Sequence, residues 1–205
     1  DHQLVLALKT LCGFSTGEIA RRLFITESNV YKRLERAREA LKKIYSGPID
    51  VGIEHKRKRL PSVRNILYLL FTEGYLSTHA TTSIRHELCE EAIRLAEILV
   101  QHSVAQESES YALLALMQLH FARLGGRTDP SGGLLLLEEQ NREKWDRRRI
   151  GNGLSWLNES TLGTQLSRFH IEAAIAAEHC LAPSFEATNW PKIVECYELL
   201  ERFSS

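Results

Sequence analysis

The residues best suited to chemistry gather in one N-terminal stretch, where short polar side chains and cations recur at helical spacing. Ser28 and Asn29 carry small hydrogen-bonding groups, and three cations follow within two turns. Such side chains can hydrogen-bond to base edges and pair with phosphates, and a capped helix N-terminus adds backbone donors. We therefore predict a nucleic-acid-binding face made of Thr26, Glu27, Ser28, Asn29, Tyr31, Lys32, Arg33 and Arg36.

Three helices, at about residues 2–12, 17–23 and 27–44, are expected to position this face. Ser15 or Thr16 can cap the second helix and Thr26 the third, while Glu18 suits the dipole of a first turn. Two helices joined by so short a turn predict a helix-turn-helix, whose second helix enters the major groove. The residues expected to be buried are Leu6, Leu8, Leu11, Ile19, Ala20, Leu23, Ile25, Val30, Leu34, Ala37 and Leu41.

The stretch GEIARRLFITESNVYKRLERAREAL resembles region four of the sigma-70 family, in its extracytoplasmic-function (ECF) branch. The family's core positions match Ala20, Ile25, Val30 and Leu34, its DNA-facing positions match Lys32, Arg33 and Arg36, and the ending RxRxxL is usual there. The resemblance implies that the third helix reads the −35 promoter element and that the module docks on the β-subunit flap of the RNA polymerase core. Modules of the LuxR type share the cap and core pattern but less often this ending, and they remain the alternative.

Charge is divided unevenly along the chain, although the net charge is zero. The first 59 residues carry 13 Lys and Arg against seven Asp and Glu, whereas the remainder carries 13 against 19. The break coincides with Gly47, Pro48, Gly52 and the basic run at 55–59. We therefore expect a DNA-binding domain at 1–45, a basic linker at 46–59 and a helical domain at 60–205.

The remaining sequence predicts an all-α body, because sustained two-residue alternation is absent. The expected helices span about 61–76, 82–102, 108–124, 140–158, 164–182 and 190–202; Thr82 or Ser83 would cap the second, and LLLL at 134–137 is interpreted as a buried helix start. Paired helices indicate a bundle or short α-solenoid that presents a surface to a protein partner. These segments resemble the helical extension of a subset of ECF sigma factors, in which further tetratricopeptide-like helices usually follow and a regulatory or polymerase-contacting role is inferred.

The sequence gives little support for catalysis, cofactors or membrane insertion. Glycine-rich nucleotide loops and nucleophile motifs are missing, and His79, His86 and Cys89 make a weak metal pattern. Glu73 is a candidate buried carboxylate whose expected partner is Arg64 or Arg85. Four dispersed cysteines predict free thiols in a reducing compartment, and no apolar run is long enough for a membrane span, so we expect a cytoplasmic protein without a cofactor.

Three function classes follow from these patterns. The first is a transcription initiation factor with a regulatory extension, which would further contact a regulatory protein or its own region two, a segment this sequence lacks. The second is a ligand- or partner-sensing transcriptional regulator, and the third is an enzyme that uses the helix-turn-helix only as a tether. The lack of a catalytic pattern disfavours the third.

Overall fold

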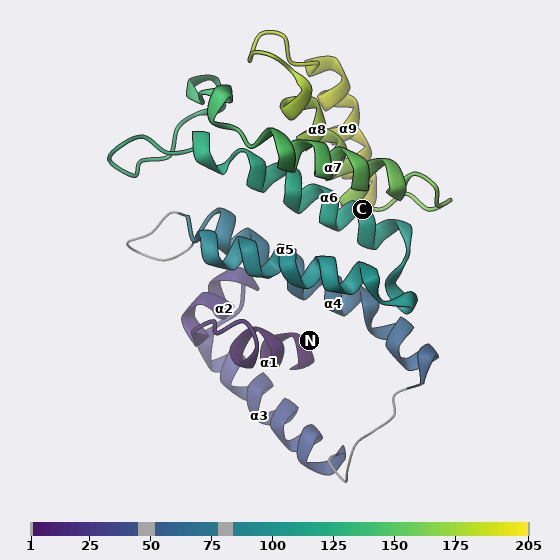
Figure 1. The fold of residues 1–205 in the computed structure, drawn as a ribbon. Helices are drawn as coiled ribbons and strands as arrows, with labels where there is room; N and C mark the ends of the chain where they lie inside the picture. Colours follow the sequence, from purple (N-terminus) through teal and green to yellow (C-terminus); the bar gives the residue numbers. More distant parts are fainter. Residues whose placement is uncertain (1, 45–51, 78–83, 205) are drawn as a thin grey trace.

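The computed structural model describes residues 2–44, 52–77 and 84–204, and helices make up most of these ranges (Figure 1). Its α-helices are α1 (His2–Thr10), α2 (Thr16–Arg22), α3 (Glu27–Ile44), α4 (Ile53–Tyr75), α5 (His86–Gln101), α6 (Ser108–Ala122), α7 (Arg147–Ser160), α8 (Arg168–Leu181) and α9 (Trp190–Ser204). Short 3₁₀ turns are η1 (Ser103–Ala105), η2 (Leu124–Gly126), η3 (Leu137–Glu139) and η4 (Arg142–Lys144). The described residues form no strand, only an isolated bridge between Thr128 and Leu134, so the predicted all-α fold is confirmed.

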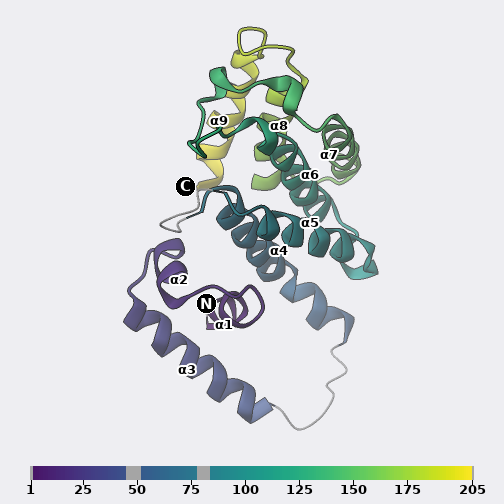
Figure 2. The same ribbon diagram turned by 60° about the vertical axis from the view of Figure 1, so that its left-hand side comes forward.

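The helices are arranged in three tiers (Figures 1 and 2). Helices α1, α2 and α3 form the module at one end, the antiparallel pair α4 and α5 lies across the middle, and α6 to α9 form the other end. Most long-range packing joins α6 to α7 and α8, α4 to α5, and α8 to α9. Stacked antiparallel pairs of this kind agree with the expected bundle or short solenoid.

Local capping explains why the module folds as predicted. The Ser15 hydroxyl accepts a hydrogen bond from the Glu18 amide, and the Glu18 carboxylate accepts one from the Ser15 amide, which makes a capping box at the start of α2. The Thr26 hydroxyl accepts from the Asn29 amide and so caps α3. Phe24 takes a φ of 53° in the turn between these helices and is 96% exposed. Its left-handed backbone, rare for a non-glycine residue, lets the chain reverse so sharply.

Two leucines expected inside the module are exposed instead. Leu11 is 82% exposed, because α1 ends at Thr10 and leaves it in the following loop. Leu41 is 50% exposed, because the last turns of α3 extend beyond the much shorter α1. The observed core consists of Val5, Leu8, Phe14, Ile19, Ala20, Val30 and Leu34, with Leu23 and Ile25 packed against it.

The same apolar core continues from the module into α4 and α5. Buried side chains of both tiers, among them Val30 of α3, Leu70 of α4 and Ile93 of α5, belong to one contiguous cluster. Helix α4 begins at Ile53 rather than near residue 61, so the basic run at 55–59 is helical and Pro61 lies inside the helix. The later start was expected because Gly47, Pro48 and Gly52 interrupt the helical pattern before the basic run. Thr82 and Ser83, the predicted caps of the next helix, lie outside the described residues, and α5 begins at His86.

The segment between α6 and α7 differs most from the expected helices. The run at 134–137 is not a buried helix start: Leu134 is 43% and Leu136 is 64% exposed. It follows a tight turn in which the Asp129 carboxylate accepts bonds from the amides of Ser131 and Gly133. The turn sends the chain back as an extended segment, and α7 begins only at Arg147, capped by Asp146.

Arg142 and Trp145 hold this segment against α8. The guanidinium of Arg142 donates to the carbonyls of His179 and Ala182, at 2.6 and 2.7 Å, and to the Thr188 hydroxyl at 3.3 Å. It therefore satisfies carbonyl groups that the end of α8 leaves without helical partners. The Trp145 ring is 2% exposed and contacts the guanidinium groups of Arg123 and Arg142, whose central carbons lie 5.2 and 4.7 Å from its centroid.

Two histidines in this region make stability depend on pH. Burial, together with nearby arginines, lowers the pKa of His120 to about 3 and the pKa of His179 to about 4. The unfolded chain, with histidine pKa values near 6.5, therefore binds more protons than the folded chain between about pH 4 and 6.5. The free energy of unfolding should fall as the pH drops below about 6.5, by about 2 kcal/mol per histidine and so about 4 kcal/mol in all at pH 5 relative to pH 7.5. Urea unfolding at both pH values measures this, and an unchanged midpoint would contradict it.

Candidate nucleic-acid interface

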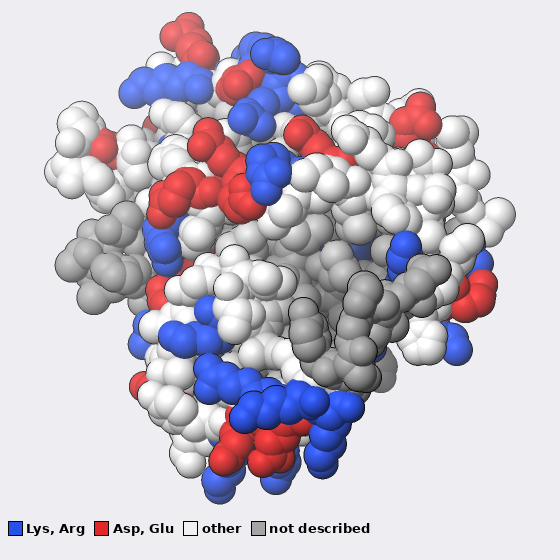
Figure 3. Space-filling view, turned by 60° about the horizontal axis from the view of Figure 1, so that its bottom comes forward, with Lys and Arg blue, Asp and Glu red and all other residues white. Residues whose placement is uncertain are grey.

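Helix α3 lies on the side of the module that faces away from the α4–α5 layer (Figure 1). Val30, Leu34 and Ala37 form its buried stripe. The opposite surface is open to solvent and carries Ser28, Asn29, Lys32 and Arg36, all exposed. Space-filling of this end shows Lys and Arg side chains gathered over its lower part (Figure 3). The N-terminal half of α3 is thus unobstructed by the body, as a major-groove helix requires.

The eight predicted residues fall into three groups. Ser28, Asn29, Lys32 and Arg36 form the outward face of α3. Glu27 and Tyr31 lie toward α2, where the Thr16 hydroxyl donates to the Glu27 carboxylate at 3.1 Å and lies 3.4 Å from the Tyr31 hydroxyl.

The remaining two residues, Thr26 and Arg33, differ from the rest in surroundings. Thr26 stands at the N-cap, where its oxygen accepts a backbone bond and its hydroxyl hydrogen can still donate to a phosphate. Arg33 is half-buried beside the core stripe and is engaged by a further contact, so it is the most constrained cation of the set.

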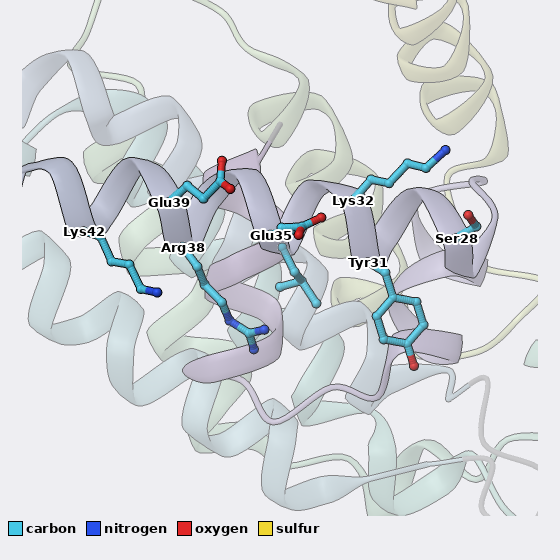
Figure 4. A pocket seen from close by; sticks show the side chains of 8 residues that line it. Ser28, Tyr31, Lys32, Glu35, Arg38, Glu39 and Lys42 are labelled. Carbon is cyan, nitrogen blue, oxygen red and sulfur yellow. The ribbon is translucent and has the colours of Figure 1, made fainter.

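Two cations that were not among the predicted residues, Arg38 and Lys42, lie farther along α3 (Figure 4). A groove of about 730 Å³ runs along the helix and is lined by Ser28, Tyr31, Lys32, Leu34, Glu35, Arg38, Glu39 and Lys42. Arg38 and Lys42 follow Tyr31 at seven and eleven residues, so helical spacing alone places all three on one flank. Glu35 and Glu39 lie among these cations, and their negative charges would repel phosphates placed near the middle of α3.

Two ion pairs fasten α2 to the body. Arg22 Nη2 lies 2.5 Å from Glu73 Oε2, and Arg85 Nη1 lies 3.2 Å from Glu18 Oε1. The partners expected for Glu73 were wrong: Arg64 pairs with Glu107 and Glu109 instead, and Arg85 pairs with Glu18. Arg22 and Glu73 are 51 residues apart and Glu18 and Arg85 are 67 residues apart, so local sequence patterns did not indicate these two pairs. They fix the orientation of the helix-turn-helix relative to α4 and α5, and we refer to the pairs Arg22–Glu73 and Glu18–Arg85 as the α2 clamp.

A serine–histidine contact in the body has the wrong proton arrangement for nucleophilic catalysis. Ser108 Oγ lies 2.7 Å from His170 Nε2, a separation typical of a nucleophile and its base. However, the Ser167 amide donates to His170 Nδ1 at 3.1 Å, so Nδ1 is the acceptor and the ring hydrogen sits on Nε2. Nε2 therefore cannot accept the proton of Ser108. Burial lowers the pKa of His170 and keeps the ring neutral in this structural role, as the N3 residue of a capping box opened by Ser167.

The cysteines and histidines give no metal centre in the part of the chain that is described. No group of three His, Cys, Asp or Glu side chains there is placed to hold an ion. His79 of the weak pattern lies outside the described ranges, and burial raises the pKa of the Cys89 thiol to about 12. The four thiols are free, as predicted. Within the described residues no helix has the length and apolar character needed to cross a lipid bilayer.

These features define a helix-turn-helix protein in which a larger helical body leaves the outer face of α3 open to solvent. Two known protein families match parts of the chain. Residues 59–161, half of the chain, match the family of unknown function described as DUF6596, and the chain belongs to this family. Residues 2–41 match sigma-70 region 4, so the module that carries the candidate interface is a region 4 domain.

The chain is also similar over nearly its whole length to one curated protein. An uncharacterized protein of Rhizobium meliloti (strain 1021) is 34% identical over 204 residues, which cover 98% of this chain and 47% of that protein. The chain thus spans about half the length of this curated relative. No solved structure matches this chain.

Proposed function

We propose that this chain is the promoter-reading and regulatory part of an ECF sigma factor that acts in the cytoplasm. In this proposal α3 reads the −35 element, the module docks on the β-subunit flap of the RNA polymerase core, and no cofactor is required. A regulatory protein or region two of the same factor would also bind this chain. The helical body would regulate transcription initiation. The observation that supports it best is the exposed, Thr26-capped N-terminal half of α3 within the stretch that matches region 4.

Alanine substitutions at Lys32, Arg33 and Arg36 test the face. Each should weaken binding to the −35 site by about 1–3 kcal/mol where the side chain contacts a base. A phosphate contact should instead lower the salt slope by about one unit and weaken all sequences alike. Fluorescence anisotropy with the whole chain measures both quantities. Arg148→Ala, which removes an exposed cation from α7, is the matched control; unchanged binding in all three face variants would overturn the assigned face.

Binding to the RNA polymerase core tests the wider proposal. A sigma factor should co-purify stoichiometrically with the core enzyme, whereas a regulator that senses a ligand should not. The same experiment with the Rhizobium meliloti relative, of which the matched part is 47%, would include contacts made by segments beyond the matched part. Failure of both proteins to bind the core would favour a ligand-sensing regulator.

One observation favours a ligand-sensing transcriptional regulator as the second candidate. An apolar cleft of about 550 Å³ opens where the loop after α1 meets α4 and α5. Its lining is aliphatic, with side chains such as Val63, Ile66 and Leu95, and Glu91 is the charged residue at its edge. The volume lies within the usual range of small-molecule sites. A ligand there would contact the DNA-reading module and the body together, which is how sensing could alter DNA binding.

A further inference from the structure

The first turns of α4 present a run of exposed cations that the helix-turn-helix does not include. Lys56, Arg57, Lys58 and Arg59 are all exposed. Arg57 lies 3.3 Å from Glu54, and Arg59 donates to the side-chain oxygen of Gln3 in α1 at 2.5 Å. Lys56 and Lys58 have no ion-pair partner among the residues that the structure describes. The run therefore keeps most of its positive charge available to an external anion.

The position of this run within the helix is electrostatically unfavourable. The N-terminus of an α-helix carries a partial positive charge, and acidic residues are preferred there, at about 0.3–1 kcal/mol each. Helix α4 has one acidic residue, Glu54, in its first turn, and cations follow directly. The positive partial charge of the helix N-terminus and the positive charges of the side chains therefore add to one another. A polyanion bound at this end of α4 would be attracted by both.

The body holds the run in a fixed position relative to α3. The α2 clamp and the continuous core join the module to α4, and the bond from Arg59 to Gln3 ties the basic end of α4 to α1. In both ribbon views the start of α4 lies at the same end of the molecule as the C-terminal end of α3 (Figures 1 and 2). Helix α3 has 18 residues and is therefore about 27 Å long, and the basic run lies toward its C-terminal end rather than its first turns.

We propose that the α4 basic run, residues 56–59, is a second DNA contact that binds the phosphate backbone flanking the site read by α3. This inference rests on the proposed function. The partner chemistry is the regularly spaced phosphate charge of a DNA duplex, because closely spaced exposed cations without base-reading neighbours suit phosphates rather than base edges. The contact adds affinity and salt dependence without adding sequence preference, and it requires a duplex longer than the recognition site.

The test compares two duplexes and two charge-matched variants of the whole chain. One variant is K56Q/R57Q/K58Q, which leaves Arg59 and its bond to Gln3 in place. The control is K144Q/R147Q/R148Q, which removes three exposed cations from the segment around the start of α7. Fluorescence anisotropy at several KCl concentrations is measured with a duplex of about 12 base pairs and one of about 30 base pairs, both centred on the same −35 site.

On the longer duplex, the α4 variant should lower the salt slope by about 2–3 units, because each phosphate contact contributes about 0.9. Its affinity should fall at least about tenfold, equally for specific and unrelated sequences. On the short duplex it should bind like the unaltered chain, and the control should do so on both. An unchanged slope on the longer duplex would overturn the second contact while leaving the promoter reader intact. An equal loss in the control variant would reduce the effect to net charge and also overturn it. Failure of the unaltered chain to bind either duplex would reject both proposals.

Discussion

Replacing Gly74 with alanine is expected to destabilise the protein by about 2–4 kcal/mol, although alanine favours helix formation. A Cβ atom at Gly74 would lie 2.7 Å from both the amide nitrogen and the Sγ of Cys89, and 2.8 Å from the carbonyl oxygen of Arg85. Two of these three atoms belong to the backbone of the α5 segment, so they cannot move aside without displacing the helix. The close approach of α4 to α5 also permits the 2.8 Å bond from the Arg85 amide to the Gly74 carbonyl.

Gly151→Ala is the matched control for this substitution. Gly151 lies in α7, is exposed, and has no atom within 4 Å of its would-be Cβ. This change should therefore stabilise the protein by about 1 kcal/mol, the usual difference between glycine and alanine in a helix. Urea unfolding followed by circular dichroism measures both. If the two substitutions shifted the midpoint in the same direction, the tight crossing of α4 and α5 would be wrong.

Replacing Arg22 with alanine is expected to cost about 3–5 kcal/mol of unfolding free energy. The Glu73 side chain is completely buried, and Arg22 is the cation that reaches it from α2. Removal of Arg22 takes the ion pair away from this buried carboxylate, whereas the 2.9 Å bond from the Ser77 hydroxyl remains. The pair joins α2 to α4, so the loss should loosen the module from the body as well as destabilise both.

A double substitution distinguishes the loss of the ion pair from the effect of leaving one charge buried alone. Arg22→Met combined with Glu73→Leu removes both charges and should cost much less than Arg22→Ala alone, because an apolar pair of similar volume can replace a buried ion pair. Arg21→Ala, one residue away and exposed, should change the stability by less than about 0.5 kcal/mol. A similar cost for Arg21→Ala and Arg22→Ala would argue against a buried pair at Glu73.

The helix-turn-helix could be predicted because its determinants are local. Ser15 and Thr26 cap the helices that follow them, and the buried positions repeat at helical spacing. The exposed side of α3 followed from the same spacing. The same helical spacing would also have predicted that Arg38 and Lys42 lie on one flank of α3, but these residues were not among those predicted.

The features that escaped prediction depend on contacts distant in sequence. Nothing near Glu73 identifies Arg22 as its partner, because the two are separated by fifty-one residues. The exposure of Leu41 depends on where α1 ends, and the path of the segment before α7 depends on Arg142 reaching the carbonyls of α8. In each case tertiary packing decides between conformations that local preference leaves nearly equal in energy.

The shared core described for the module and the α4–α5 pair bears on how the protein folds. Leu8 and Phe14 of the module belong to the same buried cluster as Leu67 and Phe71 of α4. The family boundaries, at residues 41 and 59, therefore do not mark a folding boundary. The region 4 module and the helix pair behind it should unfold in one cooperative transition. Under the proposed function, a destabilising change in α4 or α5 would therefore lower promoter occupancy without altering any residue of the α3 face.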